Sequence, residues 1–154
     1  MRCTVVGAGV SGLSCAVRLL EAGHDVEVVS DKFSPDTVSD VAAAIWYPFL
    51  TAPADKAETW GLVTYAELER LAKENPESGV HMRDGREYLR QVVEPPAWGD
   101  DIAAFGILDQ GDIPDGYVFG WQFRAPVIEM HLYMPWWLYQ EQARGQLDFA
   151  RGYH

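Results

Sequence analysis

Cysteine is scarce in this chain of 154 residues, and its basic residues are outnumbered. Lys and Arg together number 12 against 23 Asp and Glu, which gives a formal net charge of −11. Binding to nucleic acid or to an acidic membrane surface depends on clustered Lys and Arg, so we expect neither partner. Cys3 lies in an apolar run and Cys15 in a helical pattern. We expect two buried, reduced thiols in a cytoplasmic protein rather than a disulfide or a redox pair.

Long apolar runs and metal-ligand spacings are missing as well. No stretch approaches the roughly 18 consecutive apolar residues of a membrane span. The four histidines are scattered, so we expect no metal site. Gly7, Gly9 and Gly12 interrupt the first apolar stretch, which excludes the apolar core of a signal peptide. What is present, 48% apolar and 23% charged residues, is the composition of a globular protein with a core.

The first thirty residues follow a strand, helix, strand pattern. Residues 2–6 are apolar and β-branched, residues 11–22 have the spacing of an amphipathic helix, and Gly23 follows as its C-cap. The alternating valines of residues 25–30 predict a second strand. The sequence therefore predicts a βαβ opening.

A glycine motif joins the first strand to the helix. In Gly7-x-Gly9-x-x-Gly12 the first glycine allows a tight turn, the second lets the backbone approach a pyrophosphate, and the third lets helix pack on strand. Asp31 follows about 20 residues later, at the end of the second strand, where its carboxylate can accept ribose hydroxyl hydrogen bonds or act only as a turn residue. The context predicts dinucleotide binding, and Lys32 would tolerate the extra phosphate of NADP.

The remaining chain alternates between irregular, helical and strand-like patterns. The small side chains of residues 41–44 suit either close approach to a flat ligand or a tightly packed helical turn. Further on, the patterns predict a helix over residues 56–75, strands over 80–82 and 87–93 around an Asp84-Gly85 turn, strands over 117–123 and 127–134, and a short helix from Pro135 to Gly145.

Three sequence blocks resemble the D-amino acid oxidase family: residues 5–14, 30–35 and 39–48. They occur in the order and at the spacing of that family, and Trp60, Pro96-Ala97-Trp98 and residues 117–121 are similar to its middle region. The resemblance implies an α/β fold with a Rossmann-type FAD-binding unit and the beginning of a mixed-sheet substrate domain. It divides the chain into an FAD-binding segment (1–76), a substrate or interface segment (77–145) and a return strand (146–154).

The same resemblance implies FAD as the cofactor and assigns residues to its parts. They are Gly7, Ala8, Gly9, Val10 and Ser11, with Gly12, for the pyrophosphate; Asp31 and Lys32 for the adenosine; Thr37, Val38 and Ser39 for the next part; Ala43, Ala44 and Ile45 for the flavin ring; and Trp46 and Tyr47 for the substrate side. Family members often have threonine where Val38 stands and glycine where Ala44 stands, which bears on affinity for the cofactor.

The implied activity is oxidative deamination of an amino acid to a 2-oxo acid, ammonia and hydrogen peroxide. Members of the family are about twice as long, and their other half carries the tyrosine and arginine that bind the substrate carboxylate. We therefore name no catalytic residue here, and we expect a complementing polypeptide with the carboxyl-terminal half. The alternatives are a non-catalytic FAD-binding or interaction subunit and a nicotinamide-binding oxidoreductase fragment.

Overall fold

A computed structural model of the chain describes residues 1–49, 51–143 and 147–151. They form two compact units. The first unit contains Met1–Ala44, Glu77–Gly79 and the chain from Ile128 onward, and the second contains Ile45–Pro76 and Val80–Val127. The division from the resemblance (1–76, 77–145 and 146–154) is one of expected roles and stays a prediction. In the described part of the chain, no helix is both long and apolar enough to cross a membrane.

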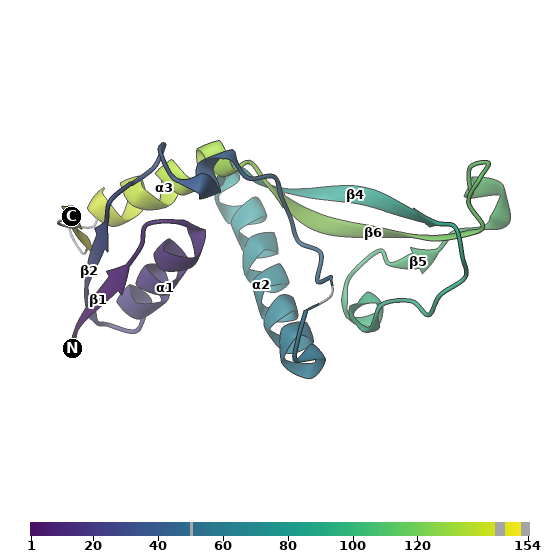
Figure 1. The fold of residues 1–154 in the computed structure, drawn as a ribbon, viewed down its shortest axis with the longest axis horizontal. Helices are drawn as coiled ribbons and strands as arrows, with labels where there is room; N and C mark the ends of the chain where they lie inside the picture. The colour runs from purple at the N-terminus through teal and green to yellow at the C-terminus, as the bar shows by residue number, and fades with distance from the viewer. Residues whose placement is uncertain (50, 144–146, 152–154) are drawn as a thin grey trace. The chain divides into compact units, whose positions relative to one another are not determined.

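The first unit is built on a three-stranded parallel sheet in the order β1-β2-β7 (Figure 1). Its elements are β1 (Arg2–Val6), α1 (Val10–Glu21), β2 (Asp25–Ser30) and β7 (Leu147–Arg151). Strand β2 pairs with β1 from Arg2↔Asp25 to Val6↔Val29, and with β7 from Val26↔Leu147 to Ser30↔Arg151. The βαβ opening predicted from the sequence is confirmed.

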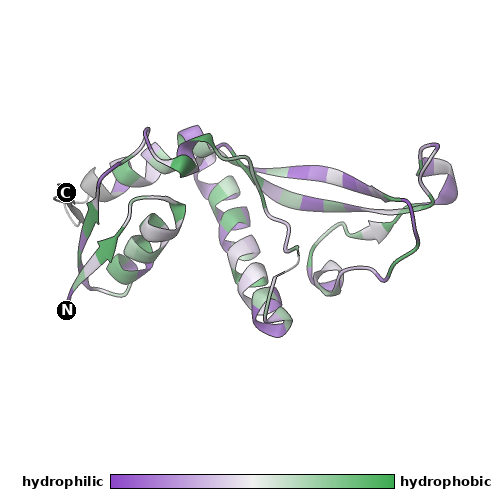
Figure 2. Cartoon of the chain, viewed as in Figure 1, coloured by the Kyte–Doolittle hydropathy of each residue, from purple (hydrophilic) through white to green (hydrophobic). Residues whose placement is uncertain are grey.

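The core of the first unit lies between α1 and the sheet. The buried residues of α1 recur at helical spacing: Leu13, Ala16, Val17 and Leu20. Of these, Ala16 and Leu20 pack with Val26 and Val28 of β2 in one cluster. Figure 2 shows these elements as largely hydrophobic. Burying each Val or Leu contributes about 1.5 to 3 kcal/mol. Cys15 lies outside the buried stripe and is exposed, and Cys3 is only half-buried, so the expectation of two buried thiols was wrong.

Helix α3 (Met130–Ala143) corrects two sequence predictions, a strand over residues 127–134 and a helix that begins at Pro135. The helix begins five residues before the proline, and the backbone N–H groups of Leu132 and Tyr133 donate to the Glu129 carbonyl at 2.9 Å. Its buried residues, Met130, Tyr133, Met134 and Trp137, have the i, i+3, i+4, i+7 spacing of a helix face. That spacing outweighs Pro135, which lies inside the helix.

The second unit combines one long helix with a small sheet (Figure 1). Its elements are β3 (Ala44–Ile45, whose first residue belongs to the first unit), α2 (Ala54–Glu74), β4 (Val80–Leu89), β5 (Gly106–Ile107) and β6 (Phe119–Ile128), with short 3-10 helices at Ala97–Asp101 (η3) and Gln110–Asp112 (η4). The sheet order is β3-β6-β4, and β5 pairs antiparallel with β6. The predicted helix over 56–75 is confirmed as α2.

Two predicted breaks in the strands of the second unit do not exist. Strand β4 runs through Asp84 and Gly85, and β6 runs through Ala125 and Pro126. A Cβ on Gly85 would lie 3.1 Å from the ring of Phe123, so this glycine makes room for a neighbouring aromatic ring instead of forming a turn. Pro126 lies near the end of β6, and its carbonyl accepts from the Trp46 backbone N–H at 2.9 Å.

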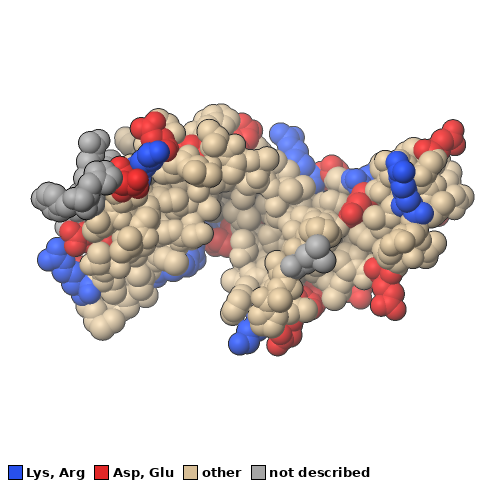
Figure 3. Space-filling view, in the orientation of Figure 1, with Lys and Arg blue, Asp and Glu red and all other residues tan. Residues whose placement is uncertain are grey.

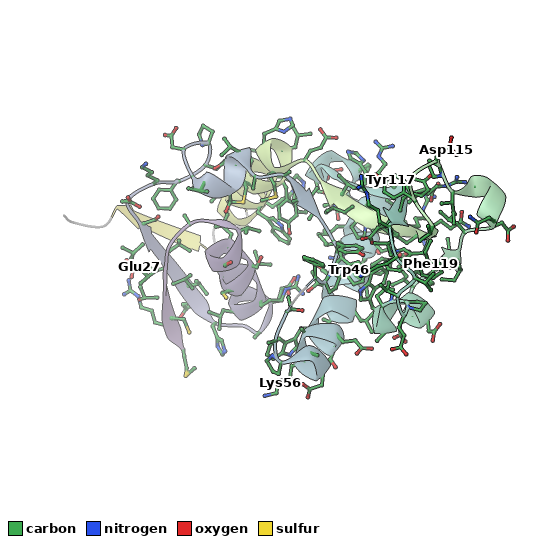
Figure 4. The ribbon with its side chains drawn as sticks, turned by 45° about the vertical axis from the view of Figure 1, so that its right-hand side comes forward. Glu27, Trp46, Lys56, Asp115, Tyr117 and Phe119 are labelled. Atoms are coloured by element: carbon green, nitrogen blue, oxygen red, sulfur yellow. The ribbon has the colours of Figure 1, made fainter. Side chains whose placement is uncertain are left out.

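Aromatic side chains fill the core of the second unit. Trp46 meets Tyr65 and Trp98 edge to face, with ring centroids 4.9 and 5.3 Å apart, and Trp98 continues the contact to Phe105 and Phe123. Figure 4 labels Trp46 among the side chains of the second unit. Edge-to-face pairs of this kind add about 0.5 to 1.5 kcal/mol each beyond the area they bury.

Candidate functional site

The turn from β1 into α1 has the geometry that the glycine motif predicts. Gly7 has a positive φ of 102°, and its N–H donates to the Val29 carbonyl at 2.8 Å, which fastens the turn to β2. A Cβ on Gly12 would lie only 1.9 Å from the Gly7 carbonyl oxygen. The first glycine therefore allows the backbone conformation, and the third allows helix and turn to pack together.

The amino terminus of α1 is suited to bind an anion. Gly9 is its N-cap in an extended conformation without a side-chain cap, and the Val10 N–H donates to the Ser39 hydroxyl at 3.0 Å. The N–H groups of Ser11 and Gly12 lie in the first turn, where a helix provides no acceptor of its own. Because the positive end of the helix dipole adds to these donors, a phosphate here would be stabilised without a basic side chain.

Asp31 and Lys32 lie at the same edge of the sheet as the glycine turn, since they follow the carboxyl end of β2. Both side chains are exposed. The Ser30 hydroxyl accepts from the Ala8 N–H at 3.3 Å and donates to the Lys32 carbonyl at 2.7 Å. Ser30 thus ties the two strand ends together and leaves the Asp31 carboxylate free to meet a ligand hydroxyl. The sequence interpretation did not single out Ser30.

Residues 37–41 bring a second loop to the amino terminus of α1. Thr37 precedes a short 3-10 helix, η1 (Val38–Val41), and Ser39 on that helix reaches Val10. Val38 is 86% exposed and has no hydroxyl group to offer a ligand. The loop places Thr37, Val38 and Ser39 in the first unit with Gly7 to Gly12, as a shared ligand site requires.

A buried carboxylate that sequence reasoning missed organises this loop. Asp40 accepts hydrogen bonds from the Thr37 N–H at 3.0 Å and from the hydroxyls of Thr37 and Ser34. Burial alone would raise the pKa of Asp40, but the hydrogen bonds from Ser34 and Thr37 outweigh it and hold the pKa below its ordinary value. The Thr-x-x-Asp spacing, which resembles a capping box, was the signal that could have found it.

The remaining predicted residues divide between the two units. Ala43 and Ala44 belong to the first unit, whereas Ile45, Trp46 and Tyr47 belong to the second. Ala43 and Ile45 are exposed, as contact with a flat ring requires. The first unit contains all the residues predicted for the pyrophosphate, the adenosine and the next part of the cofactor: Gly7 to Gly12, Asp31, Lys32 and Thr37 to Ser39. The flavin-side and substrate-side assignments stay predictions.

Trp46 and Tyr47 have partners inside the second unit. The Trp46 indole N–H donates to the Gly61 carbonyl at 2.7 Å, and the side chain is 6% exposed. The Tyr47 hydroxyl donates to the Glu87 carboxylate. Burial first, and then this bond and the negative charge of Glu87, raise the pKa of Tyr47, so the phenol stays protonated at neutral pH.

Neither the charged side chains on the face drawn in Figure 3 nor the described metal-ligating groups form a competing site. On the face shown in Figure 3, basic side chains are scattered among acidic ones. Within the part of the chain that the structure describes, no three His, Cys, Asp or Glu side chains are grouped as a metal ion needs.

Comparison with known proteins gives one family. The family model "FAD dependent oxidoreductase" matches residues 2–143. The D-amino-acid oxidase of Rubrobacter xylanophilus is 38% identical over 138 residues, and the human D-aspartate oxidase is 35% identical over 145 residues. These matches cover 89% and 88% of this chain but only 42% of each relative, so the chain spans less than half of their length.

Solved structures agree on the fold. The L-amino acid deaminase of Proteus myxofaciens matches with a TM-score of 0.70 at 11% identity, over 96% of this chain and 37% of that one. At this identity the match shows the α/β fold alone, which is the fold class expected from the sequence. The family follows from the family model, which matches residues 2–143: the chain belongs to the FAD dependent oxidoreductase family.

Proposed function

We propose that the first unit binds FAD and that the chain acts in the oxidative deamination of an amino acid. The observation that carries this proposal is the amino terminus of α1, where the Gly7 turn, the first-turn amides and the Ser39 hydroxyl converge on one point. A pyrophosphate has the charge and the acceptor oxygens that this point can bind. A Cβ on Gly9 would enter this space and would lie 3.1 Å from Ser39 Oγ. Only glycine at this position therefore lets the backbone and the ligand approach closely.

The rest of the cofactor has candidate partners among the residues that follow β2 in the sequence. Asp31 offers an exposed carboxylate to the ribose hydroxyls, with Lys32 beside it. Thr37 and Val38 adjoin Ser39, and we assign Ala43, Ala44 and Ile45 to the flavin ring. When bound, FAD supplies a hydride acceptor for the substrate Cα, and the residues of the chain hold and orient it.

The substrate we propose is a D-amino acid, with a 2-oxo acid, ammonia and hydrogen peroxide as products. Support comes from the names of the two relatives, a D-amino-acid oxidase and a D-aspartate oxidase. We assign Trp46 and Tyr47 to the substrate side, and the free Cys3 and Cys15 suit a cytoplasmic protein.

We further propose a complementing polypeptide that carries the carboxyl-terminal half. Among the described strands β1 pairs only with β2, and Val6 at its carboxyl end is 84% exposed. An open edge of this kind accepts another parallel strand. A second candidate function is an FAD-binding subunit that does not catalyse by itself, because the geometry that carries the proposal, the amino terminus of α1, concerns the cofactor and not the substrate.

Titration with FAD, followed by the quenching of flavin fluorescence, tests the proposal. We expect saturable binding of FAD and much weaker binding of NAD and NADP. Peroxide production from D-amino acids is then measured for the chain alone and with a separately expressed carboxyl-terminal half of a relative. Turnover with that half supports the oxidase, flavin binding without turnover supports the non-catalytic subunit, and preference for a nicotinamide cofactor rejects both.

A further inference from the structure

Asp40 stands out among the charged residues of the first unit. Its side chain is 8% exposed, and among the residues whose side chains the structure describes it is the one charged group that is buried. A buried carboxylate is costly unless hydrogen bonds compensate for the lost water. Its partners therefore indicate what the carboxylate is there to hold.

Both carboxylate oxygens of Asp40 are occupied by donors from its own loop. Oδ1 accepts from the Ser34 hydroxyl at 2.5 Å. Oδ2 accepts from the Thr37 backbone N–H at 3.0 Å and from the Thr37 hydroxyl at 2.5 Å. The Asp40 N–H in turn donates to the Thr37 carbonyl at 3.2 Å. The carboxylate thus closes the loop from residue 34 to residue 40 into one bonded ring.

Ser39 lies inside this closed loop, between Thr37 and Asp40. Its hydroxyl is 3.0 Å from the Val10 nitrogen and 3.1 Å from the position of a Cβ on Gly9. The Ser39 side chain is short, so its position over α1 is set by the backbone on either side. That backbone is what Asp40 holds.

We propose that Asp40 is a positioning residue for the cofactor site, which holds the Ser39 hydroxyl over the amino terminus of α1. This inference rests on the proposed binding of FAD. An asparagine at this position would turn one acceptor oxygen into an NH2 donor, which would face the hydroxyl or N–H donors of Ser34 or Thr37. The loop would then lose a bond, and Ser39 would lose its fixed position.

The first test needs no cofactor. Amide hydrogen exchange of Val10 is measured by NMR in the wild-type chain and in Ser39→Ala, Asp40→Asn and Asp36→Asn. Ser39→Ala removes the acceptor of the Val10 N–H, so its exchange rate at Val10 is the reference for complete loss of this hydrogen bond. We expect Asp40→Asn to speed Val10 exchange in the same direction, and the exposed Asp36→Asn, the matched loss of charge in the same loop, to leave it unchanged. An unchanged Val10 amide in Asp40→Asn would overturn the inference.

The second test is a double-mutant cycle on the dissociation constant of FAD. We expect Asp40→Asn to raise this constant by about tenfold, which is 1.4 kcal/mol, and to have little further effect when Ser39 is already alanine. A general loss of stability would add equally in both backgrounds, and that additive result would reject the positioning role. Failure of the wild-type chain to bind FAD would reject the proposed function instead. The Val10 exchange measurement would still test whether Asp40 positions Ser39.

A milder variant keeps the test decisive if Asp40→Asn does not fold. Ser34→Ala removes one donor to Asp40 and leaves the carboxylate and Thr37 in place. We expect a smaller change in the same direction for both Val10 exchange and FAD affinity. If the folded Ser34→Ala chain matches wild type in both measurements, the inference is wrong.

Discussion

Gly12 lies so close to Gly7 that a Cβ on Gly12 would be 1.9 Å from the Gly7 carbonyl oxygen. No side-chain movement relieves this contact, because both atoms are fixed to the backbone of the turn and of α1. The sequence motif is thus a packing requirement as well as a ligand requirement. Gly9 and Gly12 can be tested separately, since a Cβ on Gly9 would meet the Ser39 hydroxyl and a Cβ on Gly12 would meet the Gly7 backbone.

Gly12→Ala should destabilise the fold, because either the turn or the helix must shift. We expect a loss of about 3 kcal/mol in the free energy of unfolding, the upper end of the usual cost of overpacking. Urea denaturation followed by circular dichroism measures it. Gly111→Ala is the control, since no atom lies within 4 Å of a Cβ there. Equal stabilities of the two variants would contradict a clash between a Gly12 side chain and the turn.

Gly9→Val should abolish FAD binding while the chain stays folded. The neighbour of a Cβ at Gly9 is a side-chain hydroxyl, Ser39 Oγ at 3.1 Å, which can move, whereas a pyrophosphate in the same space cannot be accommodated. Flavin fluorescence titration measures binding, and circular dichroism checks the fold. Gly111→Val is the matched control. Retention of FAD by Gly9→Val would remove the α1 amino terminus from the proposed site.

Asp31→Ala should weaken the binding of FAD by about 1 to 3 kcal/mol, the usual loss for hydrogen bonds to a charged acceptor. Its carboxylate is exposed at the carboxyl end of β2, where the ribose is expected. Asp25→Ala removes the same exposed group at the opposite end of the same strand. Isothermal titration of both variants with FAD should separate them. Similar affinities would mean that Asp31 is only a turn residue.

The first unit was predictable from sequence wherever local rules act. The glycine turn, α1 and β2 follow from steric demands and periodicity within thirty residues, and the structure reproduces them. The loop around Asp40 was not predicted, because its hydrogen bonds depend on where Ser34 and Thr37 meet in space. Ser30 was missed for the same reason: its partners, Ala8 and Lys32, come together only when β1 and β2 pair.

The errors concentrate where one residue suggested a local break that tertiary packing overrides. Pro135 suggested the start of a helix, but the apolar spacing from Met130 to Trp137 extends α3 across it. Gly85 suggested a turn, but its lack of a side chain makes room for the ring of Phe123. At Gly85 the side chain that decides the structure lies elsewhere in the sequence, so a local turn signal failed. At Pro135 the buried helix face on both sides of the proline outweighs the local break.

The contribution of Asp40 to stability should depend on pH. Its pKa lies below the ordinary value of 3.8 in the folded chain, so the folded state favours the ionised form. The resulting stability is present above the ordinary pKa and is lost as pH falls through the lower, folded pKa. Urea denaturation at several pH values should show wild type more stable than Asp40→Asn at pH 7, with the difference shrinking below about pH 4. A difference independent of pH would show that the charge of Asp40 contributes nothing.

Trp46 was assigned to the substrate side, yet its side chain is 6% exposed and its N–H is already bonded to Gly61. If packing is its main role, Trp46→Ala should cost about 3 to 5 kcal/mol in the free energy of unfolding. Trp60→Ala is the matched control, because Trp60 lies on α2 with 63% of its surface exposed, and a surface substitution should change stability by about 0.5 kcal/mol or less.

The conservative variant Trp46→Phe then separates packing from substrate contact. It keeps an aromatic ring for Tyr65 and Trp98 but loses the bond to the Gly61 carbonyl, so we expect a loss of about 1 to 3 kcal/mol for the unpaired acceptor and the smaller ring. FAD affinity should stay at the wild-type value, because the residues that carry the proposed pyrophosphate contact lie in the first unit. The opposite result has two parts: the Trp46→Phe chain has wild-type stability, and its complex with the complementing half has a raised KM for the amino acid. That result would show that Trp46 contacts substrate.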